Sequence, residues 1–367
     1  MLRALTTVLA MLLACTRSPA TLAEPGDVAR GDNQIASRFA TEVDSLRRSH
    51  RIPGLAVVVL RDTTIILARG FGLANVELAV AVTPETPFNI ASVAKPISAV
   101  VALRLVERGL LDLDRPMKSF AGFTDFCAAA RTNGGLFFGD YQCDTQPLTL
   151  RHVLSMTANG IPGTRFFYNP VSFSWASRPM AEAGKTPFSE LTAKLVFQPA
   201  GMRRSARIHR QLALTPALAA DLAVPYHVDS IGQIAISDPP PPQGDGAAGG
   251  VISTVMDLAR FDVALSAGRL LSPDSRKVML TANRSPTGTV LPYGLGWFVQ
   301  DHAGEQLLWH SGLWEGKYSA LYLKAPERRL TLILLANSDG LRWDNRLDEA
   351  AVERSPFAHA FLSRFPR

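Results

Sequence analysis

A short apolar segment with two reactive side chains, residues 88–96, constrains this chain more than any other stretch. Ser92 and Lys95 lie three residues apart where an apolar helical run begins, and Gly109 closes that run. Side chains at this spacing share one face of a helix, so the lysine amine would lie one turn from the serine hydroxyl. A desolvated lysine can take the proton of a serine and make it a nucleophile. A capping serine beside a solvated lysine would give the same pattern, so the segment alone leaves both interpretations open.

Runs of β-forming residues flank this helix on both sides in the sequence. Two of them, residues 55–60 and 64–68, are joined by a three-residue turn and predict a hairpin. Four more lie between residues 295 and 336, and an amphipathic helix is expected over residues 348–364. The middle of the chain is expected to form mainly helices. This order predicts an α+β fold, with an antiparallel β-sheet flanked by N- and C-terminal helices and an inserted, mostly helical domain.

The expected domain boundaries follow from this order of elements. Four consecutive prolines near the end of the insertion would form a stiff, extended connection back to the sheet. The chain then divides into a signal peptide at 1–23, a flexible lead-in at 24–33, a discontinuous sheet domain at 34–115 and 250–367, and an inserted helical domain at 116–249.

The charge pattern argues against a nucleic-acid partner. The formal net charge is +6, but the basic residues are scattered and form no basic run, which indicates a solvated surface. Beyond the N-terminal segment, no stretch is long and apolar enough to cross a bilayer. We therefore expect neither nucleic-acid binding nor a transmembrane span in the mature chain.

The N-terminus is typical of an export signal. Arg3 precedes an apolar core that is too short to span a bilayer as a mature helix. Cleavage before Glu24 would release a soluble protein. Alternatively, residues 12–15 resemble a lipoprotein box, in which Cys15 would carry a lipid anchor; Leu13 is a less usual residue there, so we favour simple export. We expect an exported protein, periplasmic or secreted, and leave the lipidated form open.

Two cysteines, Cys127 and Cys143, remain after either fate of Cys15. In an oxidising compartment they would form one disulfide that closes a short loop. Two free thiols are the alternative. No histidine or further cysteine lies at ligand spacing, so we expect no metal site.

Three motifs in order make the chain resemble the penicillin-recognising serine hydrolases. This group includes class C β-lactamases, DD-peptidases, D-aminopeptidases and serine esterases. Its first motif, Ser-x-x-Lys, falls at Ser92 and Lys95. The second, Tyr-x-Asn or Tyr-x-Ser, falls at Tyr168, and the third, a His-x-Gly variant of Lys-Thr-Gly, falls at residues 310–312. The resemblance runs from about residue 40 to about residue 340.

The resemblance implies an acyl-enzyme mechanism that needs no metal or other cofactor. Ser92 would attack a carbonyl, with Lys95 as base or proton relay. Tyr168, beside the lysine ammonium, would have a lowered pKa and would pass the proton to the leaving group. Backbone N–H groups of Ser92 and Leu313 would stabilise the oxyanion. The expected substrate-binding residues are His310, Ser311, Gly312 and Leu313, with the His310 ring lining the pocket and contacting a substrate carboxylate or carbonyl.

Two of these assignments have alternatives. Tyr168 would also fit as a core aromatic residue beside Phe166 and Phe167. Residues 302–304 also match His-x-Gly, but they lie in a polar turn, whereas His310 follows an apolar strand. We therefore favour Tyr168 and His310 as site residues.

Two departures from the family pattern bear on the substrate. Pro170 stands where an amide or hydroxyl side chain would help hold a substrate amide. His310 replaces a lysine, and a mostly neutral histidine suits the carboxylate of a β-lactam less well. We expect an esterase or a D-amino-acid peptidase or amidase acting on a small molecule, a peptide or a peptidoglycan-like substrate. The alternatives are a β-lactamase, a DD-carboxypeptidase, or a penicillin-binding sensor that acylates without turnover.

Overall fold

The structure is a computed structural model that describes residues 22, 30–132, 135, 137–143, 147–238, 243–345, 347 and 349–365. Apart from residue 22, the expected signal peptide lies outside the described residues, as do Cys15 and most of the expected lead-in. Within the described part of the chain, none of the helices has both the length and the apolar character of a membrane-spanning segment.

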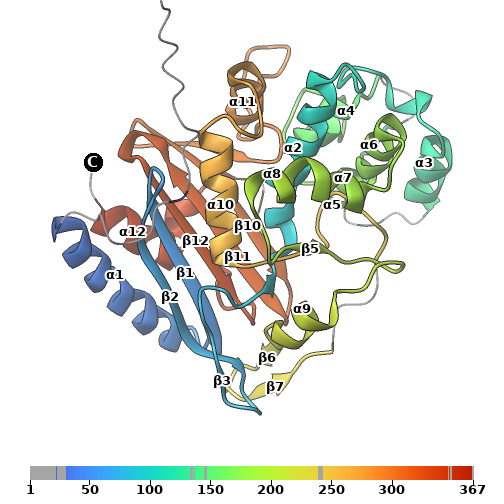
Figure 1. The fold of residues 1–367 in the computed structure, drawn as a ribbon. Coiled ribbons are helices and arrows are strands. Elements are labelled where there is room, and N and C mark those ends of the chain that lie inside the picture. Colours follow the sequence, from blue (N-terminus) through green and yellow to red (C-terminus); the bar gives the residue numbers. More distant parts are fainter. Residues whose placement is uncertain are drawn as a thin grey trace, which may run out of the picture.

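A seven-stranded antiparallel sheet forms the centre of the molecule, in the order β3-β2-β1-β12-β11-β10-β9 (Figure 1). The strands are β1 (Gly54–Arg61), β2 (Thr64–Asn75), β3 (Val80–Ala81), β9 (Phe298–His302), β10 (Glu305–Trp314), β11 (Tyr318–Ala325) and β12 (Leu330–Ala336). β1 pairs with β12, so the N-terminal hairpin and the C-terminal strands share one sheet. All but the last residue of β1 are buried, as in a strand covered on both faces. The predicted α+β fold is confirmed.

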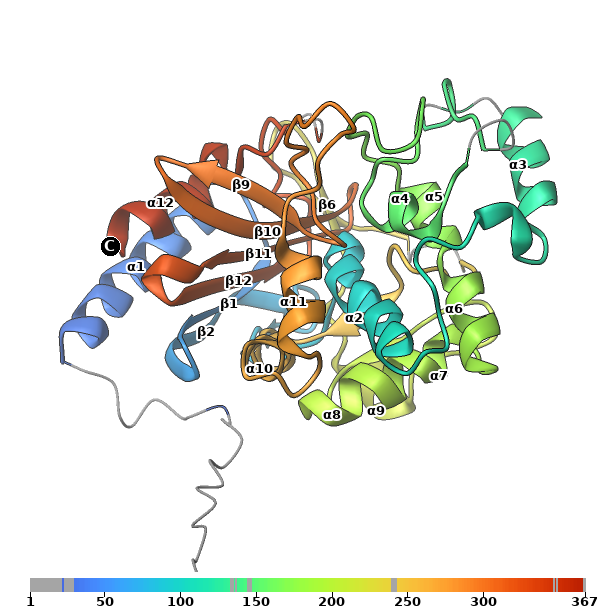
Figure 2. The same ribbon diagram turned by 90° about the horizontal axis from the view of Figure 1, so that it is seen from above.

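Helices cover both faces of this sheet (Figure 2). On one face, α1 (Arg30–Ser49) packs against α12 (Pro356–Arg364), where the Phe39 ring lies 5.9 Å from that of Phe361. On the other face, α10 (Val255–Ser266) packs against β1 and β12. The expected C-terminal helix over 348–364 begins late, at Pro356, because Ser355 caps it and proline is favoured in the first turn.

The middle of the chain forms the predicted helical region beside the sheet (Figure 1). Helix α2 (Ala94–Glu107) packs against several of these helices, including α6 and α7. The elements of this region are α3 (Phe123–Thr132), α4 (Leu150–Leu154), α5 (Pro170–Trp175), α6 (Ser177–Gly184), α7 (Phe188–Thr192), a π-helical turn (Ala193–Phe197), α8 (Gln198–Ala200) and α9 (Pro216–Asp221).

Smaller elements connect the helical region to the sheet. Helix α11 (Pro273–Leu280) follows α10. A three-stranded sheet is made of β4 (Phe88–Asn89), β8 (Val251–Ser253) and β5 (Ala206–Arg207), and β6 (Tyr226–Val228) pairs with β7 (Ile234–Ile236). Short 3₁₀ turns cover Ala91–Val93, Met117–Ser119, Pro326–Arg328 and Val352–Arg354.

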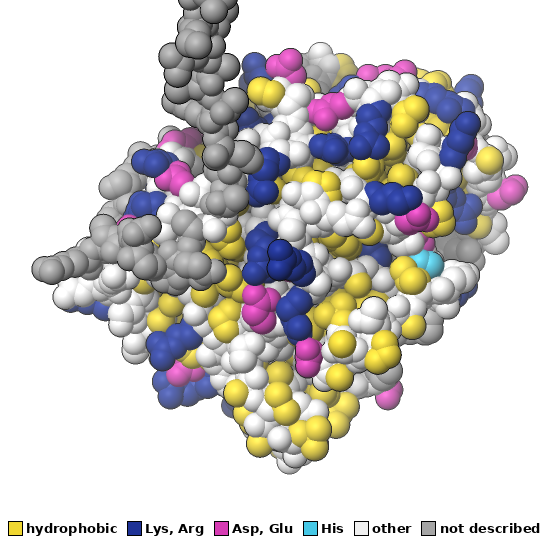
Figure 3. All heavy atoms as spheres, in the orientation of Figure 1, with side chains coloured by type: hydrophobic (Ala, Val, Ile, Leu, Met, Phe, Trp, Pro, Cys, Tyr) yellow, Lys and Arg dark blue, Asp and Glu magenta, His cyan; other side chains and the backbone are white. Residues whose placement is uncertain are grey.

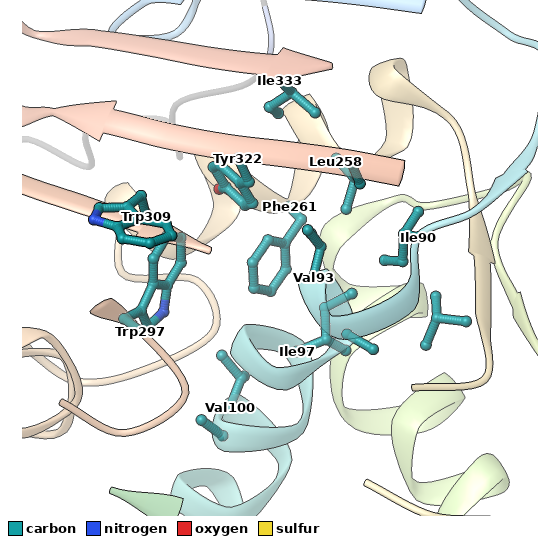
Figure 4. Close-up of a cluster of buried hydrophobic side chains, with 14 of the residues drawn as sticks. Ile90, Val93, Ile97, Val100, Leu258, Phe261, Trp297, Trp309, Tyr322 and Ile333 are labelled. Atoms are coloured by element: carbon teal, nitrogen blue, oxygen red, sulfur yellow. The ribbon is translucent and has the colours of Figure 1, made fainter. Parts of the chain in front are cut away.

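A shared core fixes helix α2 against the sheet. Figure 4 shows Val93, Ile97 and Val100 of this region facing Phe261 of α10, with Trp297 and Tyr322 alongside. The Trp297 and Tyr322 rings lie 4.9 Å apart in an edge-to-face arrangement. All six side chains are buried, so the position of α2 is set by packing from α10 and β11.

The face of the molecule drawn in Figure 3 carries side chains of both charges. On the face drawn in Figure 3, Lys and Arg side chains are dispersed among acidic and neutral ones. Several arginines there and elsewhere form exposed ion pairs, such as Arg364 with Glu42.

Candidate active site

Ser92 lies in a 3₁₀ turn that leads directly into helix α2. The residue before it, Ala91, has a φ of 46°, which is unfavourable for a residue with a side chain. The turn is held by the Asn89 side chain, whose Oδ1 accepts a hydrogen bond from the Ala91 N–H at 2.9 Å. The predicted helix therefore begins two residues after Ser92, and a strained turn presents the hydroxyl. Such strain is common at functional sites.

The Lys95 amine lies beside the Ser92 hydroxyl, with 2.7 Å between Nζ and Oγ. Lys95 is completely buried, and its Nζ also donates to the Ala248 carbonyl at 3.2 Å. The amine lies 5.0 Å from the centre of the Tyr168 ring and 5.6 Å from that of Phe173. Burial holds the pKa of Lys95 well below its ordinary value. A larger fraction of the amine is then neutral, the form that can accept the Ser92 proton.

Tyr168 lies immediately before α5 and reaches the same serine. It is half-buried, and its side chain hydrogen-bonds Ser92. Its ring stacks on Phe298 with 6.1 Å between centroids. Burial raises the pKa of Tyr168, although the hydrogen bond from Ser92 opposes this. The expectation of a lowered pKa was wrong, because burial of the phenol outweighs the effect of its hydrogen bond with Ser92. The phenol therefore stays protonated at neutral pH.

His310 lies on β10 near this group, but it lines neither of the two cavities that border Ser92. The ring is fully buried, and its centroid is 6.0 Å from that of Tyr168. Its Nδ1 bonds the Ser311 carbonyl at 2.6 Å, so Nδ1 carries the proton and Nε2 accepts from the Tyr293 hydroxyl at 2.9 Å. Burial, with the nearby charge of Lys95, holds the pKa of His310 well below its ordinary value. The expectation that its ring would line the pocket and contact a substrate was wrong, because the side chain is buried in the core and packs near Tyr168. The alternative, His302, lies at the turn between β9 and β10.

The next residues of β10 border the serine. Ser311, Gly312 and Leu313 line a cavity together with Ser92. A Cβ on Gly312 would lie 2.3 Å from the Ile90 carbonyl oxygen, so only glycine lets β10 approach the turn that holds Ser92 this closely. The two proposed oxyanion donors, the N–H groups of Ser92 and Leu313, belong to the elements that meet here.

Two cavities meet at Ser92. The first has a volume of about 550 Å³ and the second of about 350 Å³, and both are lined by Ser92, Pro170 and Leu313. A further hollow of about 650 Å³ adjoins the first and shares Val171 and Ser174 with it. The first cavity is also lined by Ala91, Val171, Ser174, Gln243, Gly244, Gly246, Ala248, Gly249, Gly250, Trp314 and Glu315. The second is also lined by Phe137, Tyr168, Ser311, Gly312, Ala320, Leu341, Arg342, Trp343, Asn345 and Leu347.

Two residues of the second motif, Asn169 and Pro170, have different structural roles. Asn169 is buried and caps α5, because its Oδ1 accepts from the Ser172 N–H at 2.9 Å. Its Nδ2 donates to the Phe137 carbonyl and to Asn159 Oδ1, both at 2.9 Å. Pro170 then faces both cavities and offers no hydrogen bond there. The structural role of Asn169 was not foreseen, since a motif does not show which way a side chain points.

The loop over residues 243–250 is fixed to α2 by groups that the sequence did not single out. The Ser98 hydroxyl donates to the Ala247 carbonyl at 2.6 Å, which places the next carbonyl against Lys95. Buried Arg207 donates to the Gly246 carbonyl at 2.6 Å and to Asp245 Oδ1 at 3.0 Å. A buried polar partner for a loop carbonyl has no periodic signature in a sequence.

Cys127 and Cys143 form the predicted disulfide. It ties α3 to the loop that carries Tyr141, whose hydroxyl lies 3.1 Å from the Ser172 Oγ of α5. The disulfide therefore stabilises the wall of the helical region next to the second motif.

Comparison with known proteins agrees with this geometry. A penicillin-binding protein of Bacillus subtilis is 24% identical over 329 residues, covering 82% of this chain and 71% of the relative. A D-aminopeptidase of Gluconobacter oxydans is 27% identical over 331 residues, covering 83% of this chain but only 59% of the relative. The chain thus spans less than two thirds of the aminopeptidase.

A solved structure shares the fold. The octameric penicillin-binding protein homologue from Pyrococcus abyssi superposes with a TM-score of 0.70 at 23% identity, covering 89% of this chain and 77% of that one. A model of the β-lactamase family matches residues 38–354, which include Ser92, Lys95, Tyr168 and the strand with His310. The chain belongs to the β-lactamase family.

Proposed function

We propose that this protein is a serine hydrolase that cleaves an ester or amide through an acyl-enzyme on Ser92. The observation that carries the proposal is the 2.7 Å separation of Lys95 Nζ and Ser92 Oγ at the junction of two cavities. Full burial of the amine supplies a base, and a base beside a serine makes it a nucleophile.

The proposed steps follow from the positions of three side chains. Neutral Lys95 takes the Ser92 proton while Oγ bonds to the substrate carbonyl carbon. The carbonyl oxygen, now negative, receives hydrogen bonds from the N–H groups of Ser92 and Leu313. Tyr168, a protonated phenol that hydrogen-bonds Ser92, gives its proton to the leaving alcohol or amine and recovers one from Lys95. Water then attacks the acyl carbon and gives a proton to neutral Lys95. The bond between Ser92 Oγ and the acyl carbon breaks, Lys95 returns the proton to Oγ, and the acid is released.

The substrate we propose is an ester or amide of the esterase or D-amino-acid peptidase type. The D-aminopeptidase relative supports the second possibility. Pro170, at the wall of both cavities, offers no amide or hydroxyl to a substrate amide, and His310 is buried. The features expected to hold a β-lactam are thus replaced, which disfavours efficient β-lactam hydrolysis.

The test is to offer the purified protein three substrates: a chromogenic short-chain ester, a D-amino-acid amide and a cephalosporin. Turnover and intact protein mass are followed for the native protein and for Ser92→Ala. Multiple turnovers of the ester or the amide that are lost in Ser92→Ala support the proposal. A stable mass adduct without turnover would instead indicate a penicillin-binding sensor. Turnover that survives Ser92→Ala would refute the mechanism.

We also propose that the protein is exported to the periplasm or secreted. The apolar N-terminal segment and the Cys127–Cys143 disulfide support this, since disulfides persist in oxidising compartments. Mass analysis of the protein recovered from cell fractions is the test. A chain that starts at Glu24 would indicate simple cleavage, and one with lipid on Cys15 would indicate an anchor. A full-length cytoplasmic chain would refute export.

A further inference from the structure

The two cavities that meet at Ser92 are bordered by opposite charges. Among the described residues that line the first cavity, Glu315 alone is charged, and among those that line the second, Arg342 alone is charged. Glu315 follows β10, two residues after Leu313, and Arg342 follows β12. The two sides of the scissile bond would therefore meet different charges.

Hydrogen bonds connect the two turns that carry Glu315 and Arg342. The turn that bears Glu315 is tied to the turn before Arg342, because the Gly316 N–H donates to Asp339 Oδ2 at 3.2 Å. The Arg342 N–H in turn donates to the Asp339 carbonyl at 2.9 Å. These bonds hold together the backbone of the two turns from which the side chains of Glu315 and Arg342 extend.

At rest, Glu315 and Arg342 pair with each other. Arg342 Nη1 lies 3.2 Å from Glu315 Oε1, and the side chains are 58% and 79% exposed, respectively. An ion pair this exposed adds little to stability, so opening it costs little. A ligand with an ammonium group near Glu315 and a carboxylate near Arg342 would exchange one ion pair for two.

A buried donor without a partner in the described part of the chain lies in the wall of the second cavity. Trp343 lines it, and its indole Nε1 is buried without a hydrogen-bond partner among the described residues. A buried donor without an acceptor is costly, and a carboxylate entering beside Arg342 could supply that acceptor after a small shift. The first cavity offers Glu315 and no basic side chain among its described lining residues.

We propose that the site selects short unblocked peptides, with the free ammonium group toward Glu315 and the free carboxylate toward Arg342 and Trp343. An unblocked dipeptide has these two charges on opposite sides of its one amide bond. The proposal rests on the proposed hydrolase function, and it assigns the charge of the substrate on each side of Ser92.

The experiment uses one dipeptide in unblocked, N-acetylated, C-amidated and doubly blocked forms, each made with D and with L residues. We expect each free charge to raise kcat/KM about fivefold at low ionic strength. Glu315→Gln should remove the advantage of the free ammonium group only. Arg342→Gln should remove that of the free carboxylate only, and Trp343→Phe should reduce it. For each variant the readout is the ratio of kcat/KM between two forms of the dipeptide, so a general loss of activity cancels.

Controls separate charge recognition from general damage. Glu315→Asp and Arg342→Lys keep the charges and should keep most of the preference. Glu42→Gln removes an exposed carboxylate of α1 that pairs with Arg364, on the other face of the sheet, and should change nothing. In the native protein, raising the ionic strength from about 0.02 M to about 0.5 M should shrink the preference through screening.

The outcomes distinguish this inference from the proposed function. Equal rates for the four forms, or a charge preference that survives Glu315→Gln and Arg342→Gln, would overturn the inference. So would hydrolysis of the chromogenic ester through Ser92 with no cleavage of any dipeptide form, which would leave the hydrolase function intact. The absence of Ser92-dependent hydrolysis of the ester, the D-amino-acid amide and every dipeptide form would overturn the proposed function.

Discussion

Replacing Gly312 with alanine tests whether the close approach of β10 to the Ser92 turn is required for activity. The added Cβ would lie 2.3 Å from the Ile90 carbonyl oxygen and 3.2 Å from the Ala320 side chain. A relaxed contact of this kind needs about 3.4 Å or more, so the turn and the strand must separate by roughly 1 Å. Overpacking of this kind costs about 1–3 kcal/mol of stability. A 1 Å misplacement of the reacting groups lowers the rate about 100-fold.

The measurements are the free energy of unfolding from urea titration and the Ser92-dependent rate of ester hydrolysis. Gly139→Ala is the control, because Gly139 is exposed and its Cβ would meet no atom within 4 Å. Adding Ala320→Gly to Gly312→Ala relieves only the side-chain contact, so we expect little recovery. A Gly312→Ala protein with native stability and native activity would refute the argument. Full recovery of stability and activity in the double variant would show that the contact with Ala320, and not the contact with Ile90, causes the loss.

Four further predictions concern the buried groups. Lys95→Met should lower the acylation rate at least about 100-fold by removing the base. The pKa of Lys95 is lower in the folded protein than in the unfolded chain, where it is about 10.4. Between these two pKa values, the stability of the native protein relative to Lys95→Met should therefore rise with pH. Urea titrations in which both proteins show the same pH dependence would contradict this. Since burial keeps His310 neutral, kcat/KM should show no inflection near pH 6.5. Tyr293→Phe should cost about 1–3 kcal/mol by leaving Nε2 of His310 unpaired, and an unchanged unfolding midpoint would argue against that hydrogen bond. Replacing Cys127 and Cys143 with serine should cost about 3 kcal/mol for a loop of this length, and equal urea midpoints with and without reductant would show that the bond adds nothing.

The elements predictable from the sequence are those whose signal is local. The apolar runs of β1 and β12 and the Ser92–Lys95 spacing each lie within one short stretch, and the structure contains them. The start of α12 was misplaced, because a capping serine and a proline outweighed amphipathic periodicity.

The electrostatics of the candidate site could not be predicted in this way. The pKa of Tyr168 is raised by burial, and its ring stacks on Phe298, which comes from a distant part of the chain. The same holds for His310, whose partner Tyr293 belongs to a separate loop. Motif spacing identifies these residues but does not determine their burial, and burial decides their protonation.

The pairing of β1 with β12 also has a consequence for how the protein is made. It joins Leu55, near the start of the chain, to Ala336, near its end. A ribosome delivers Ser92 and Lys95 early, but β10, which would provide the facing wall, emerges much later. Non-local pairing of this kind folds slowly, because a long loop must close before the contacts form. Until β12 has been synthesised, β1 therefore lacks the partner strand that covers one of its edges, and the serine meets its facing wall only after β10 has been synthesised.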